Sequence, residues 1–146
     1  MDNKHLKKSI NTVKRNNRKS KLIIILSYLI IWVFSMIVFW FFTSDTDVSG
    51  FCLLYLWIVF PVTSFVLSVI IGKNDYWGHK KWLVSLFFGI MYMLAEYGTF
   101  SMANNISSKH LNEPEWGMIL IMGSISIIGL FIGDFFYRMR NKTDNF

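Results

Sequence analysis

The hydrophobic positions of the chain form four long runs that are separated by short polar segments. Crossing the hydrocarbon core of a bilayer takes about 20 helical residues. Four runs are long enough to do so, at residues 22–42, 51–72, 82–103 and 116–137. The segments between them are polar and too short to fold independently. The pattern therefore predicts an all-α polytopic membrane protein, a single domain whose four transmembrane helices form an antiparallel bundle.

Lysine and arginine are distributed unequally between the polar segments. Eight lie in the N-terminal tail, residues 1–21, three in the loop between the second and third runs, and three after the fourth run. The other two loops share only Lys109. Because these residues are retained on the cytoplasmic side during insertion, we predict that both termini are cytoplasmic. Residues 1–21 would then be a basic cytoplasmic tail.

Composition supports the membrane class and excludes several activities. With 53% hydrophobic and 18% aromatic residues, the chain is too apolar for a soluble domain of this size. A single cysteine, Cys52, and three scattered histidines provide neither a disulfide nor metal-ligand spacing. The net charge of +6 is not accompanied by a nucleic-acid recognition fold. We therefore expect no enzyme activity, no cofactor, no metal and no nucleic-acid partner.

Small and polar residues indicate which helix faces pack, since membrane helices associate through close backbone approach and polar contacts. Gly129 and Gly133 form a GxxxG pair, which we interpret first as intramolecular packing and second as a dimerisation face. Asp134 lies four residues before Arg138, a spacing that predicts a salt bridge. In the third run, small and polar residues recur at intervals of four and three, as in a heptad seam: Ser85, Gly89, Tyr92, Glu96, Thr99 and Ala103.

Glu96 is a carboxylate within this seam, so we expect it to point into the bundle. No lysine, arginine or histidine lies at its predicted depth, and an unpaired charge there is very costly. We therefore expect the carboxyl group to be protonated at neutral pH. A protonated carboxyl both donates and accepts hydrogen bonds. Its partners in a polar or proton site would be a carbonyl freed by the helix-breaking Pro61 or the side chains of Tyr92, Thr99, Ser35 and Ser124.

Two functions are compatible with Glu96. If Glu96 only joins helices, the chain is a non-enzymatic accessory or interaction protein of the plasma membrane. Its partner would be another membrane protein or a second copy of the chain. If water reaches it, a titratable group suits a small proton-coupled transporter, which would be dimeric. In that respect the chain resembles the small multidrug exporters, although those chains are shorter and carry their glutamate in the first span.

Cations and aromatic residues gather at the predicted cytoplasmic surface. The basic tail is suited to association with an anionic lipid surface. The loop between the second and third runs also contains Trp77 and is followed by Trp82. We interpret this composition first as retention of cations and an interfacial aromatic belt, and second as a binding surface for anionic headgroups. Four residues of the loop are candidate contacts for anionic headgroups: Lys73, His79, Lys80 and Lys81.

Several short stretches between residues 61 and 104 carry a resemblance. They are PVTS (61–64), IGKNDYWG (71–78), KW (81–82), FG (88–89) and MYMLAEYGTFSMAN (91–104). In these stretches the chain resembles a group of small four-span integral membrane proteins of Gram-positive bacteria. The resemblance covers under a third of the chain. It implies a multi-pass protein of a bacterial plasma membrane, and it brings no activity, ligand or catalytic residue.

Overall fold

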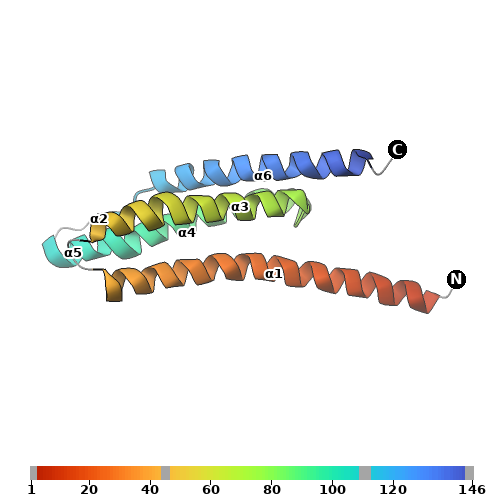
Figure 1. Cartoon of the computed structure of the whole chain (residues 1–146), viewed down its shortest axis with the longest axis horizontal. Helices are drawn as coiled ribbons and strands as arrows, with labels where there is room; N and C mark the ends of the chain where they lie inside the picture. Colours follow the sequence, from red (N-terminus) through yellow and green to blue (C-terminus); the bar gives the residue numbers. More distant parts are fainter. Residues whose placement is uncertain (1–2, 44–46, 109–112, 144–146) are drawn as a thin grey trace.

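The structure, a computed structural model, describes residues 3–43, 47–108 and 113–143. Long helices with similar axial directions dominate these residues (Figure 1). In chain order the elements are α1 (Asn3–Phe42), α2 (Val48–Phe51), the π-helix η1 (Cys52–Val59), α3 (Phe60–Lys73), the 3₁₀-helix η2 (Gly78–Lys81), α4 (Trp82–Glu96), the π-helix η3 (Tyr97–Ser101), α5 (Met102–Ser108) and α6 (Gly117–Thr143).

Four helical stretches are long and apolar enough to cross a membrane. They are Arg18–Phe42, Val48–Lys73, Gly78–Asn104 and Gly117–Lys142. The all-α class and the four runs predicted from the sequence are thereby confirmed, with boundaries that differ by a few residues. One difference is that α1 already begins at Asn3. The residues expected to form a separate tail therefore continue the first helix.

Helices α3 and α6 meet through their backbones. A Cβ atom built on Gly72 of α3 would lie 2.5 Å from the carbonyl oxygen of Leu130, and one on Gly133 would collide with the carbonyl oxygen of Val69. A Cβ atom on Gly129 would also be too close to α3, at 2.8 Å from the carbonyl oxygen of Phe65. Only glycine permits this approach, which replaces the hydrophobic effect as the source of helix association in lipid. The GxxxG pair therefore packs within the chain, as its first interpretation predicted.

Helix α4 covers the same part of α6 through small and hydroxyl-bearing residues. The Ser85 hydroxyl donates a hydrogen bond of 2.8 Å to the carbonyl oxygen of Gly123, and Gly89 lies against the backbone of Ile119. These contacts come from the heptad seam predicted in the third run. Within that seam Ser85, Gly89, Tyr92 and Thr99 are buried, whereas Glu96 and Ala103 are half-buried.

The second helical stretch widens into the π-helix η1 just before Pro61. The amide of Phe60 donates to the carbonyl oxygen of Tyr55, five residues back. The next bond of that ladder would join residue 61 to Leu56, but proline has no N–H to donate. The Tyr92 hydroxyl donates to the Leu56 carbonyl instead, at 3.0 Å. The carbonyl expected to be freed by Pro61 is thus present, and its partner is a tyrosine of α4.

Helix α1 is attached to the bundle mainly by aromatic side chains. The indole N–H of Trp32 donates to the carbonyl oxygen of Met91 at 2.8 Å, and that of Trp40 donates to Gly98 at 3.1 Å. About one helical turn before Trp32, Tyr28 is buried, and the centroid of its ring lies 4.6 Å from that of Phe88. Trp32, near the middle of the apolar stretch Arg18–Phe42, is therefore a packing residue.

We predict that Gly133→Ala lowers the free energy of unfolding by about 2 kcal/mol, because the added methyl group must push α6 away from α3. Gly123→Ala is the matched control on the same helix. Its Cβ atom would lie 3.6 Å from the Ser85 hydroxyl, an ordinary contact, so its stability should change little. Denaturant unfolding of both purified variants in detergent micelles measures the difference. Equal stability of the two variants would contradict the packing described.

Candidate functional site

A charged cluster lies at the turn between α3 and α4. The backbone of this turn sets the position of one of its residues, Asp75. The amide of Tyr76 donates to the carbonyl oxygen of Ile71, and that of Asp75 donates to Gly72, both at 3.1 Å. This pair of bonds is the Schellman motif, which requires a left-handed residue after the helix. Asp75 takes that position with φ of 46°, where glycine is the usual residue. The turn directs its carboxylate towards α4.

Lys81 is the centre of this cluster. Its ammonium group donates to Asp75 Oδ1 at 3.1 Å and also to Asp134 Oδ1. Asp134 in turn accepts from Arg138 Nε at 2.9 Å through its second oxygen. Only 9% of the Lys81 side chain and 16% of the Asp134 side chain are exposed. Two cations and two anions thus balance one another while joining the α3–α4 loop, α4 and α6, and we call these four residues the Lys81 cluster.

The Lys81 cluster changes the interpretation of two sequence features. The salt bridge predicted between Asp134 and Arg138 is confirmed. Lys81, however, is buried and paired, so it is not placed to contact lipid headgroups as the sequence had suggested. The three other candidate headgroup contacts, Lys73, His79 and Lys80, are exposed. No local spacing could have linked Lys81 to Asp134, because 53 residues separate them.

Glu96 lies near the opposite end of the bundle, at the last residue of α4. Its side chain is half-buried, and its carboxylate accepts a hydrogen bond from the Ser101 hydroxyl, at 3.1 Å to Oε1. Residues five apart do not share a face of an α-helix. Here the π-helix η3, whose hydrogen bonds run between residues five apart, brings Ser101 round to Glu96. Ser101 cannot be linked to Glu96 from the sequence, because the pattern of this run predicts an uninterrupted α-helix.

The partners predicted for the Glu96 carboxylate bond elsewhere. Tyr92 donates to the Leu56 carbonyl, as described above, and Thr99 donates to the carbonyl oxygen of Ala95 at 2.7 Å. Ser35 and Ser124 donate to the carbonyl oxygens of Trp32 and Leu120 on their own helices. Serine and threonine hydroxyls in helices commonly bond back to a preceding carbonyl. None of these four hydroxyls thus donates to the Glu96 carboxylate, although Thr99 also donates to the backbone carbonyl of Glu96 at 3.2 Å.

The chemistry open to these groups is limited. Among the described residues there is no group of three or more histidine, cysteine, aspartate or glutamate side chains that could hold a metal ion. The Lys81 cluster is internally neutral, and Glu96 is bound to a serine of its own helical stretch. The Lys81 cluster suits the joining of helices, whereas the Glu96–Ser101 bond stays within one helical stretch. Comparison of the chain with protein-family models, curated proteins and solved structures finds no match.

We predict that Lys81→Met lowers the free energy of unfolding by about 2 kcal/mol, because it leaves Asp134 half-paired in a poorly hydrated position. The cost should fall below the 3–5 kcal/mol of a fully buried pair, since 34% of the Asp75 side chain is exposed.

A double-mutant cycle with Asp134→Asn tests this prediction. If the two residues act as a pair, the double variant loses less stability than the sum of the two single variants. Additive losses, measured by denaturant unfolding in micelles, would show that the pair contributes nothing of its own. Lys80→Met, one residue away and exposed, is the matched control and should leave stability nearly unchanged.

Proposed function

We propose that the chain is a non-enzymatic accessory or interaction protein of the plasma membrane, built as an antiparallel four-helix bundle with both termini in the cytoplasm. The distribution of lysine and arginine supports this orientation. In Figure 1 the start of α1, the end of α6 and the junction that follows α3 lie towards the same end of the molecule. That end carries the basic segments of the sequence.

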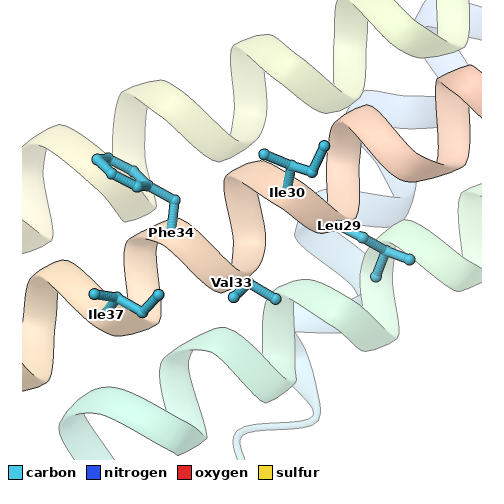
Figure 2. Close-up of a pocket in the computed structure, with 5 residues that line it drawn as sticks. All are labelled: Leu29, Ile30, Val33, Phe34 and Ile37. Carbon is cyan, nitrogen blue, oxygen red and sulfur yellow. The ribbon is translucent and has the colours of Figure 1, made fainter.

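The observation that carries the proposal is an apolar strip on the outside of α1. Figure 2 shows Leu29, Ile30, Val33, Phe34 and Ile37 along one side of this helix, where they line a shallow groove of about 380 Å³. At about 100° per residue, the centre of the strip lies about 180° from the face that α1 buries in the bundle. That buried face consists of Ile24, Tyr28, Ser35 and Phe39.

The strip is hollowed between its side chains, where the ridge of another helix would fit. It also belongs to α1, which the two tryptophan hydrogen bonds and a few ring contacts hold to the bundle. In contrast, α3 and α6 meet backbone to backbone. Helix α1 can therefore shift to fit a partner without opening the contact of α3 with α6. The partner favoured by this surface is an apolar transmembrane helix of another membrane protein.

We predict that a photoreactive residue in place of Phe34 forms a discrete protein adduct in native membranes, because a partner helix would lie in the groove. A photoreactive residue in place of Ile128 of α6 is the matched control, since the exposures are 57% for Phe34 and 54% for Ile128. Gel electrophoresis and mass spectrometry identify the adduct. An adduct of twice the chain mass would name a second copy as the partner. No adduct, or equal adducts at both positions, would contradict the proposal.

We further predict that Glu96→Gln leaves the membrane level of the protein and the Phe34 adduct nearly unchanged, because an amide oxygen still accepts from Ser101 but cannot titrate. The proton-coupled alternative expects the opposite. In liposomes the wild type would then move protons in response to a substrate, and the variant would not. Loss of the adduct from a well-folded variant, or substrate-dependent proton movement abolished by Glu96→Gln, would favour the transporter over the accessory protein.

A further inference from the structure

A second groove lies between α1 and the start of α4, at the end of the bundle that carries the Lys81 cluster. It has a volume of about 300 Å³, at the lower end of the range of small-molecule pockets, which is about 300–1,000 Å³. Six residues line it: Ile25, Trp77, Lys80, Leu83, Val84 and Phe87. We call it the α1–α4 groove.

Polar and apolar groups are separated along the α1–α4 groove in the same order on both helices. On α4 and the loop before it, Lys80 lies at one end and Phe87 at the other, about 10 Å further along at helical rise. On α1, Lys21 precedes Ile25 by one turn, so the two share a face. Each helix therefore presents an ammonium group at the end of the bundle and aliphatic or aromatic carbon towards its middle.

Trp77 joins the two cations at the mouth of the groove. The Lys21 ammonium group lies 5.4 Å from the centre of the Trp77 ring, within the range of a cation–π interaction. Trp77 itself has φ of 66°, a left-handed conformation that is strained for a bulky residue. That strained turn holds the indole ring beside both α1 and Lys80. Lys80 is exposed and lies outside the Lys81 cluster, so its charge is available.

We propose that the α1–α4 groove binds one anionic phospholipid, with its phosphate at Lys80 and Lys21 and one acyl chain along Ile25, Leu83 and Phe87. A phospholipid has the order of charge and hydrocarbon that the groove presents, and it meets the groove from the bilayer itself. A zwitterionic lipid would fill the apolar part but would leave the two ammonium groups without a net negative partner. This proposal does not depend on the proposed partner of α1, because the groove lies between α1 and α4.

The test uses the full-length protein in nanodiscs that contain phosphatidylcholine and a small fraction of phosphatidylglycerol. Phosphatidylglycerol with brominated acyl chains should quench tryptophan fluorescence more strongly than brominated phosphatidylcholine at the same fraction. The excess should disappear in Trp77→Phe, which identifies the quenched ring. Native mass spectrometry should show one retained phosphatidylglycerol molecule for each chain.

Two variants test the charged part and the apolar part of the site separately. Lys80→Gln should weaken retention of phosphatidylglycerol about fivefold, the change expected for one cation at an anionic surface. Leu83→Trp should displace the acyl chain and reduce retention while both ammonium groups remain. Lys73→Gln is the matched control, because Lys73 is exposed at the same end of the bundle but does not line the groove.

Three results would overturn the proposal. Equal losses in Lys80→Gln and Lys73→Gln would show general attraction to the surface. Equal retention of the two lipids by the wild type would show an ordinary lipid annulus. Displacement of the lipid by soluble glycerol phosphate, with no effect of Leu83→Trp, would show an anion site that does not hold an acyl chain. The Phe34 adduct is measured on the same variants, so that failure of the lipid site and failure of the partner surface are told apart.

Discussion

The backbone contact between α3 and α6 is the constraint on which the rest of the bundle depends. In lipid the surroundings are as apolar as the side chains, so helices gain little from hiding carbon and must approach closely. Gly72 and Gly133 permit that approach, and the adjacent hydroxyls of Ser68 and Ser126 join at 2.7 Å. With α3 and α6 fixed in this way, α4 can rest on α6 through Ser85 and Gly89. Helix α1 packs on the outside of these helices and is held by the hydrogen bonds of Trp32 and Trp40.

Polar contacts lie at three levels along the bundle. At one end the Lys81 cluster ties the loop, α4 and α6 together with balanced charges. In the middle, the Tyr92 hydroxyl donates to the carbonyl oxygen of Leu56, which has no backbone donor because Pro61 lacks an N–H. Towards the other end, η3 folds Ser101 onto Glu96. Each of these contacts satisfies a group that would otherwise be costly to place in an apolar medium. The Lys81 cluster and the Tyr92 bond thus hold helices in register, whereas the Ser101–Glu96 bond fixes the shape of one helical stretch.

The two proposed recognition surfaces both involve α1. Its buried face packs the rings of Tyr28 and Phe39 against the bundle, and its opposite face is the apolar strip of Figure 2. Its edge towards α4 forms one wall of the α1–α4 groove. We propose that one of these surfaces receives a protein helix and the other a lipid. The helix with the fewest rigid contacts would then be the one that meets both partners.

The sequence by itself determined the features that depend on local pattern: four helical runs, the small-residue seam of the third run, the spacing of the GxxxG pair and the Asp134–Arg138 pair. Length, period and spacing suffice for these because they involve neighbours on one helix. That the GxxxG pair packs against α3 was decided by the tertiary structure. The tertiary structure alone decided that Lys81 belongs with Asp134 and Asp75, and that Tyr92 bonds to Leu56. It also decided that Glu96 meets Ser101, since π-helical widening alters which residues share a face. Side chains brought together by helix register and by irregular turns leave no periodic trace in the sequence.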